Sequence, residues 1–213
     1  PVYLEMFLFD TYEEGIEFLS SYLVKRIAFL TESFANSEPA EPFNPNPGDQ
    51  YMIMGKQSEK AITVVDRSLT EDALLCIWEP STTDESQLWE FIPAGNDYFR
   101  IMNIHSGLTI TGSERGNSLK QSTIDNANSA QEWKIVAVGN DDDVYGIINK
   151  KTGYSFDSSG SGISDGNPVI EWDNQISQDK PNQCWHLVKI KSGVTGLHAT
   201  TSIENIVIYP NPA

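Results

Sequence analysis

The chain has 213 residues, of which 39% are hydrophobic and 10% aromatic, a composition that supports a folded core and excludes a disordered polymer. Its 30 acidic residues against 14 basic ones give a net charge of −16, which disfavours nucleic acid or an anionic membrane as a partner. The two cysteines, Cys76 and Cys184, are too few for a disulfide framework or a zinc site, and no apolar run is long enough to insert into a membrane. Two buried free thiols are the expected state of these cysteines, and the sequence leaves open whether they pair.

Residues 1–35 predict an amphipathic helix. Asp10 and Thr11 are good N-cap residues, and Glu13 and Glu14 follow each of them by three positions, as in a capping box. Apolar residues then recur in steps of three or four, at Ile16, Leu19, Leu23, Ile27, Leu30 and Phe34. We expect this segment to be the C-terminal helix of a truncated upstream domain, because such an apolar face needs a partner.

Residues 36–50 contain four prolines and predict a stiff, extended linker, which places a domain boundary there. From residue 51 to residue 190 the pattern changes to short runs of β-branched and aromatic residues, separated by Gly, Asn, Asp and Ser. Such short runs, punctuated by turn residues, are typical of an all-β domain built from hairpins.

An internal repeat divides this β segment into three units. A Gln-x-Trp motif occurs three times, at Gln87 and Trp89, Gln131 and Trp133, and Gln183 and Trp185. A turn motif also recurs, from Asn103 to Gly107 and again from Asn149 to Gly153. Each unit of about 45 residues has room for roughly four short strands and is too small to bury its own apolar face, so we expect the three to share one core around a pseudo-threefold axis.

The three Gln-x-Trp units resemble the ricin B-type lectin domain, which implies a β-trefoil over residues 51–190. In that family the Gln and Trp of the motif are structural. The sugar is held in each unit by an Asp after the second strand, an aromatic residue on the third strand and an Asn just before the motif. The resemblance implies a non-catalytic carbohydrate-binding module whose partner is a glycan or polysaccharide and which needs no cofactor or metal.

Only the third unit matches the family's sugar-binding pattern in full. The match is carried by Asp157, Trp172 and Asn182, beside Gln183, whereas Ile170 stands where many members have a glutamine. Taken singly, Asp157 could be a turn residue and Trp172 an ordinary strand aromatic.

The other two units match the pattern less well. The first unit keeps Trp78 and Gln87 but has Thr63 and Ser86 in place of the Asp and the Asn, so it predicts at most a weakened site. The second unit has Thr109, Ser122 and Ala130 at these positions and is interpreted as structural only. The alternative function is therefore a degenerate β-trefoil that serves as a spacer or protein-interaction domain.

No motif predicts an enzyme in this chain, although a longer parent could carry an upstream catalytic domain. The histidines His105, His186 and His198 lack Cys or acidic partners at a metal-ligand spacing. The acidic run from Asn140 to Asp143 lacks the spaced ligands of a calcium loop and is interpreted as a solvated turn.

The two ends of the chain carry further resemblances. Residues 191–204 predict a second linker. Within residues 205–213, the sequence from Ile208 to Ala213 resembles the start of the C-terminal sorting domain of type IX secretion substrates in Bacteroidetes, so we expect a truncated sorting domain. This implies a secreted or outer-membrane surface location. The N-terminal helix is similar to the last helix of CotH-like kinase domains, which would make the upstream domain of the same polypeptide a further partner.

Overall fold

The computed structural model describes residues 12–35, 42–139 and 143–193 of the chain. The chain divides into an N-terminal region, Pro1–Glu41, and a C-terminal region, Pro42–Ala213. The described part of the N-terminal region is the helix α1 (Tyr12–Ala35), as its apolar periodicity predicts. Glu13 and Glu14 lie in its first turn, where they oppose the positive end of the helix dipole. The predicted caps Asp10 and Thr11 lie outside the described residues. Within the described ranges, no helix has the length and apolar character needed to cross a membrane.

The described residues of the C-terminal region form twelve strands in three successive sets of four, one set for each repeat unit, as the repeat predicts. The first set is β1 (Gln50–Gly55), β2 (Ala61–Val64), β3 (Leu75–Trp78) and β4 (Leu88–Gly95). The second set is β5 (Tyr98–Asn103), β6 (Thr109–Thr111), β7 (Lys120–Ser122) and β8 (Trp133–Ala137). The third set is β9 (Val144–Asn149), β10 (Ser155–Ser158), β11 (Val169–Trp172) and β12 (Trp185–Lys191).

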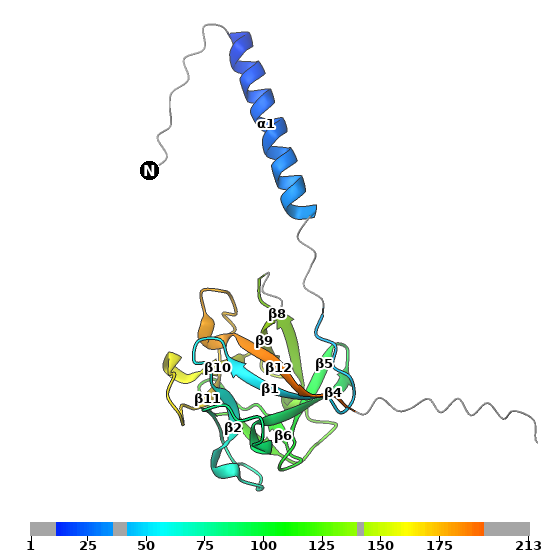
Figure 1. Ribbon diagram of the computed structural model, residues 1–213, viewed down its shortest axis with the longest axis vertical. Coiled ribbons are helices and arrows are strands. Elements are labelled where there is room, and N and C mark those ends of the chain that lie inside the picture. The colour runs from blue at the N-terminus through cyan, green and yellow to red at the C-terminus, as the bar shows by residue number, and fades with distance from the viewer. Residues whose placement is uncertain (1–11, 36–41, 140–142, 194–213) are drawn as a thin grey trace, which may run out of the picture. The chain divides into compact units, whose positions relative to one another are not determined.

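The first and last strands of the three sets form a closed barrel (Figure 1). The antiparallel pairs run in a ring from β1 to β4, β5, β8, β9 and β12, and β12 pairs with β1 again. Because the ring closes, none of these six strands is left as a free sheet edge.

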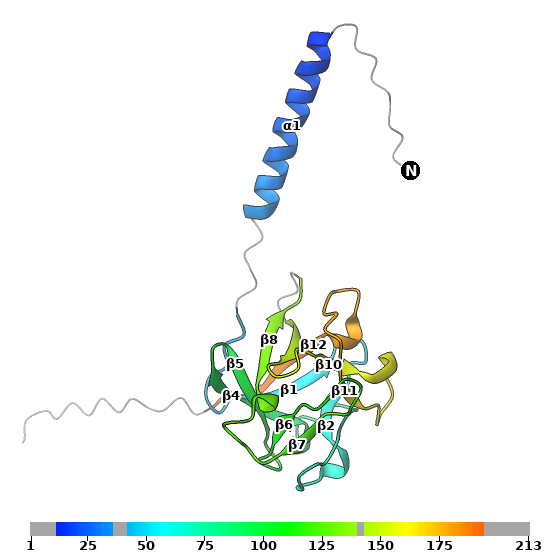
Figure 2. The same ribbon diagram turned by 180° about the vertical axis from the view of Figure 1, so that it is seen from behind.

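The second and third strands of each set form a hairpin, and the three hairpins meet one another. β2 pairs with β3, β6 with β7, and β10 with β11. Single bridges then join the hairpins in all three combinations, Leu74 with Lys120, Cys76 with Pro168, and Ser118 with Ile170. Figure 2 shows β2, β6 and β7 together at one end of the barrel. A six-stranded barrel with a triplet of hairpins is a β-trefoil, which confirms the predicted fold.

The Gln-x-Trp motifs have the same structural role in every unit. Each Trp is fully buried, and its indole Nε1 donates to the backbone oxygen of Ile62, Ile110 or Phe156, respectively. Each Gln holds the loop after the third strand of its unit, since its Nε2 donates to a backbone oxygen there and its Oε1 accepts from a backbone N–H two residues further on. These pairs are Glu79 and Ser81 for Gln87, Thr123 and Asp125 for Gln131, and Asp173 and Gln175 for Gln183.

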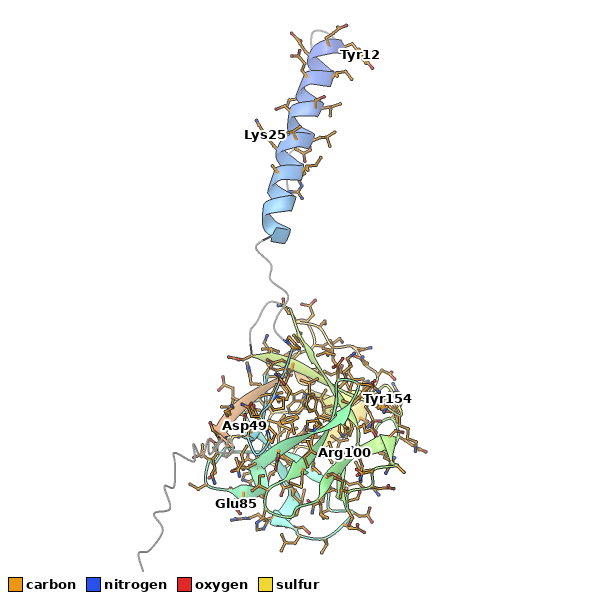
Figure 3. The ribbon with its side chains drawn as sticks, turned by 90° about the vertical axis from the view of Figure 1, so that its right-hand side faces the viewer. Tyr12, Lys25, Asp49, Glu85, Arg100 and Tyr154 are labelled. Carbon is orange, nitrogen blue, oxygen red and sulfur yellow. The ribbon has the colours of Figure 1, made fainter. Side chains whose placement is uncertain are left out.

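Residues ahead of β1 also pack on the barrel, although their proline content suggests a linker. The ring of Phe43 lies edge-on to four aromatic rings, at centroid distances of 4.8 to 5.7 Å: those of Tyr51, Phe91, Phe99 and Tyr145. Asp49, which is 1% exposed, accepts from the Lys189 ammonium at 2.6 Å and from the Gly193 N–H at 2.8 Å. Figure 3 shows Asp49 beside the end of β12. This aspartate therefore ties the chain entering the trefoil to the chain leaving it.

Both cysteines are buried free thiols, as expected from their number. Burial raises the pKa of Cys76 to about 11, so its thiol stays protonated at neutral pH. The Cys184 Sγ contacts the backbone oxygens of Ser177 and Lys180 and packs inside the third unit.

Candidate functional site

The third unit contains a pocket of about 360 Å³ that brings together three of the residues predicted to bind sugar. Asp157 comes from β10, Trp172 from the end of β11, and Asn182 from the short 3-10 helix η5 (Pro181–Gln183). The pocket is lined by Asp157, Ser159, Gly160, Ser161, Ile170, Trp172, Gln175, Lys180 and Asn182. Gln183 does not line it and lies behind Asp157, where it is 1% exposed.

Two amide groups orient the Asp157 carboxylate. Its Oδ2 accepts from Asn182 Nδ2 and from Gln183 Nε2, each at 2.8 Å, and Gln183 is itself anchored to the Asp173 backbone. Among the described residues no hydrogen-bond partner is found for Oδ1. The carboxyl is 4% exposed, and burial raises its pKa above the ordinary range although the two amide bonds act in the opposite direction.

The Trp172 ring is held from outside its own unit. The Arg115 guanidinium, which follows β6 in the second unit, lies 3.8 Å from the centroid of the indole. Arg115 also forms a two-point ion pair with Asp173, with N–O distances of 2.8 and 2.9 Å. Gly116 approaches the same ring so closely that a Cβ added there would lie 3.4 Å from it. A loop of the second unit therefore sets the position of the aromatic platform in the third.

The first unit places Trp78 and Gln87 at the equivalent positions, because Trp78 pairs with Ala61 as Trp172 pairs with Ser155. Trp78 is 48% exposed and lines a pocket of about 330 Å³. Thr63 stands where Asp157 stands in the third unit, and its hydroxyl lies 3.1 Å from the Ser86 hydroxyl. This position therefore offers a neutral hydroxyl in place of a carboxylate.

In the second unit, the residue predicted to correspond to Asp157 is wrong. Thr111, and not Thr109, is equivalent to Asp157, because Thr109 pairs with Ser122 as Ser155 pairs with Trp172. Gln131 Nε2 also donates to Thr111 Oγ1, as Gln183 does to Asp157. The two threonines are two residues apart, so their side chains face the same side of the strand. The alternation of side chains along a strand therefore cannot show which of them corresponds to Asp157. The apolar residue before each position, Ile62, Ile110 or Phe156, is the signal that aligns them.

At the three corrected positions the second unit has neither a carboxylate nor an aromatic ring. Thr111, Ser122 and Ala130 occupy the three positions, in agreement with its interpretation as a structural repeat. In the described part of the chain, no group of three or more His, Cys, Asp or Glu side chains is placed to hold a metal ion. His198 and residues 140–142 of the acidic run lie outside that part.

Comparison with known proteins agrees with this fold. The family model of the ricin-type beta-trefoil lectin domain-like proteins matches residues 42–122 and 98–172. No curated protein sequence matches the chain.

Several solved structures share the trefoil. An exo-beta-1,3-galactanase from Clostridium thermocellum is 28% identical, with a TM-score of 0.61, and the match covers 69% of this chain but only 31% of the enzyme. The Macrolepiota procera ricin B-like lectin in complex with lactose is 18% identical over 69% of this chain and 99% of the lectin, with a TM-score of 0.56. The C-half of the earthworm R-type lectin in complex with GalNAc is 15% identical over 66% of this chain and 98% of its own, with a TM-score of 0.54. The chain described here belongs to the ricin-type beta-trefoil lectin domain-like family.

Proposed function

We propose that this chain is a non-catalytic carbohydrate-binding module that attaches a secreted or cell-surface multidomain protein to a glycan. The observation that carries the proposal is the third-unit pocket, where a buried carboxylate, a partly exposed indole and an amide side chain face one space. Two fold relatives, from Macrolepiota procera and earthworm, are described with lactose and GalNAc bound, which supports a sugar as the ligand class.

The chemistry of the pocket suits a neutral pyranose. The free Oδ1 of Asp157 can accept a sugar hydroxyl in a charge-assisted hydrogen bond, which is stronger than a neutral one. The indole of Trp172 offers an apolar face to the C–H side of the ring. Asn182 donates its Nδ2 to Asp157, so its Oδ1 remains to accept a further hydroxyl. Three contacts of this kind bind weakly, and several copies on one surface would raise the avidity.

Glycan-array and polysaccharide pull-down binding by the isolated chain tests this proposal. We expect Asp157→Asn to lower the affinity about tenfold or more, because a hydrogen bond to a charged group contributes about 1.5–3 kcal/mol. Trp172→Ala removes the stacking platform and should reduce binding to a similar extent. Ser122→Ala, at the position of Trp172 in the second unit, is the matched control and should bind as the parent does.

The alternative function is a trefoil that has lost sugar binding and serves as a spacer or a protein-docking surface. The observation that favours it is the pair of threonines, Thr63 and Thr111, that replace the carboxylate in two of the units. Failure of the parent chain to bind any glycan would support this alternative, as would capture of its upstream domain in a pull-down. Turnover of a polysaccharide by the isolated chain would contradict both functions.

We further propose that the ends of the chain belong to larger parts of the same polypeptide. Residues 205–213 are proposed as the beginning of a type IX sorting domain and residues 1–35 as the end of a CotH-like kinase domain, with linkers at 36–50 and 191–204. The tail lies outside the described residues. The full-length open reading frame tests both points, since each proposal requires the remainder of that domain to adjoin residue 213 or residue 1.

A further inference from the structure

The third-unit pocket has a neighbour where the second and third units meet. This neighbour, called the boundary pocket, has a volume of about 410 Å³ and is lined by Ser113, Glu114, Arg115, Thr152 and Tyr154. The first three residues lie in the loop between β6 and β7, and the last two lie in the turn between β9 and β10. Arg115 lines the boundary pocket, and its guanidinium lies 3.8 Å from the centroid of the Trp172 indole, which lines the third-unit pocket. The two pockets therefore meet at this stacked pair of side chains.

A buried carboxylate holds the two walls of the boundary pocket together. Glu171, on β11, is 0% exposed and accepts hydrogen bonds from the Thr152 hydroxyl at 2.8 Å and from the Ser113 backbone N–H. Its backbone N–H donates to the carbonyl of Asn117, and its carbonyl accepts from the N–H of Gly116. Glu171 therefore fixes the loop of the second unit against the turn of the third.

This anchor is specific to the boundary between the second and third units. In the other two units the residue before the stacking position is neutral, Ile77 before Trp78 and Gln121 before Ser122. Among the described residues Glu171 has no ion-pair partner, and burial of a carboxylate without one is destabilising. A destabilising group at this place is explained if the arrangement that it holds has a function.

Three polar groups of the boundary pocket have no hydrogen-bond partner among the described residues. They are Arg115 Nη1, the Tyr154 hydroxyl and the Glu114 carboxylate. The rest of the Arg115 guanidinium is held by Asp173, which accepts from its Nε and Nη2. The boundary pocket thus combines two donors and one charged acceptor, on side chains from both units.

These groups suit a neutral sugar better than an ion. The charge of Arg115 is balanced by Asp173, and Glu114 adds a negative charge to a chain of net charge −16, which disfavours an anion. A carboxylate accepts sugar hydroxyls in charge-assisted hydrogen bonds, and guanidinium and phenol groups donate to hydroxyl oxygens. The half-buried ring of Tyr154 adds an aromatic surface for the C–H groups of a sugar.

We infer that the ligand of the third unit is a neutral oligosaccharide, with one sugar residue in the third-unit pocket and the next in the boundary pocket. Glu114 and Tyr154 bind the second sugar residue, and the pair of Arg115 and Asp173 lies between the two residues. This inference rests on the proposed carbohydrate-binding function and adds the size of the ligand, a glycan chain of at least two residues. It also gives the second unit, which does not match the sugar-binding pattern itself, a part in binding.

Indole and backbone N–H signals in a two-dimensional 1H–15N spectrum report the two pockets separately. The Trp172 indole reports the third-unit pocket, and the backbone N–H groups of Glu114 and Tyr154 report the boundary pocket. The chain would be titrated with D-galactose, D-glucose and D-xylose and with a disaccharide of each, β-1,3-galactobiose, cellobiose and β-1,4-xylobiose. In at least one series we expect the disaccharide to shift both sets of signals and to bind about tenfold more tightly than the monosaccharide, the effect of one hydrogen bond to a charged group. The monosaccharide should shift the Trp172 indole alone.

Two variants remove the proposed contacts to the second sugar residue. Glu114→Gln and Tyr154→Ala should each lower the disaccharide affinity about five- to tenfold and leave the monosaccharide affinity unchanged. Glu85→Gln and Tyr98→Ala are the matched controls, since neither residue lines the third-unit pocket or the boundary pocket. Figure 3 shows Glu85 and Tyr154 on different sides of the trefoil. Unchanged signals from the three buried core indoles show that each variant is folded.

Failure of this inference can be told apart from failure of the proposed function. If each sugar that moves the Trp172 signal binds equally well as a monosaccharide and as a disaccharide, the inference is wrong and the third-unit site stands. The same conclusion follows if the Glu114 and Tyr154 variants bind the disaccharide as the parent does. If no sugar moves the Trp172 signal, the third-unit site and the inference are both wrong.

Discussion

The three units of this trefoil differ in single residues at the positions proposed to hold a sugar. The Gln-x-Trp positions are occupied in all three units, but the residue at the position of Asp157 differs. It is a carboxylate in the third unit, Asp157, and a neutral hydroxyl in the first and second, Thr63 and Thr111. Two amides orient the Asp157 carboxylate, which is buried and therefore carries a desolvation cost. That cost makes its protonation state a measurable property of the site.

Glycan binding by the third unit should weaken as the pH falls. The weakening should begin at a higher pH than it would if the aspartate had its ordinary pKa. Burial raises the pKa of Asp157 above its usual 3.8, and the protonated carboxyl can no longer offer a charged acceptor. A pH series of titrations that follows the Trp172 indole measures this. Asp157→Asn should remove the step, and a parent affinity that holds constant down to pH 4 would contradict it.

Protonation of Asp157 should change the stability of the fold in the opposite direction to its effect on glycan binding. A folded-state pKa above the unfolded value means that the folded protein binds the proton more tightly, so the contribution of Asp157 to the free energy of unfolding rises as pH falls through that window. Protonation of Asp157 itself therefore does not destabilise the fold in the range where binding is lost.

At the scale of elements, neighbouring units complete each other's hairpins. The loop that contains Arg115 and Gly116 in the second unit packs on Trp172 in the third, and Gly166 in the third unit lies near Trp78 in the first. At the equivalent place in the first unit, Lys60 forms ion pairs with Glu79 and Asp165.

Arg115→Ala should lower the affinity of the third unit about two- to fivefold, because the indole loses the cation that orders it. The ion pair of Arg115 is solvent-exposed, so we expect little change in the thermal midpoint. A glycan titration followed by the indole N–H signal of Trp172 in a two-dimensional 1H–15N spectrum measures this affinity. Lys60→Ala, which removes the equivalent clamp in the first unit, should leave that affinity unchanged, and equal losses in both variants would contradict an effect specific to this loop.

At the scale of the whole trefoil, the closure of the barrel depends on a contact between its first and last strands. Asp49 joins the segment before β1 to Lys189 and Gly193 at the end of β12, and Phe43 packs into the aromatic cluster beside it. These bonds hold the pKa of Asp49 well below its usual value. Its stabilising contribution is therefore complete above the ordinary aspartate range and is lost as pH falls below it.

Asp49→Asn should lower the free energy of unfolding by about 1–3 kcal/mol, because it breaks a buried charge-assisted contact whose partner Lys189 is half exposed and can be hydrated. Urea unfolding of the parent and the variant measures this. Asp72→Asn, which removes an exposed ion pair with Lys120, is the control and should change stability little. Sugar binding at 25 °C should be retained, since Asp49 lines neither sugar pocket.

The sequence by itself determined the three-unit β-trefoil, because its largest core residues, Trp89, Trp133 and Trp185, recur with a Gln that holds a local turn. It also identified Asp157, Trp172 and Asn182 as a set, since each lies at a fixed offset within one unit. Tertiary structure decided the rest. Side-chain alternation repeats every two residues and so leaves both Thr109 and Thr111 as possible equivalents of Asp157. The pairing of the strands shows that the equivalent residue is Thr111.

Contacts between units could not be predicted from the sequence, because they join residues with no fixed spacing. Packing brought Arg115 onto Trp172 and Asp49 onto Lys189, pairs that are distant along the chain. The lining of the first-unit pocket could not be predicted either, since Val65, Cys76 and Asp84 come from three different segments. A repeat motif is therefore sufficient to predict the fold, whereas the lining of each pocket consists of side chains that only folding brings together.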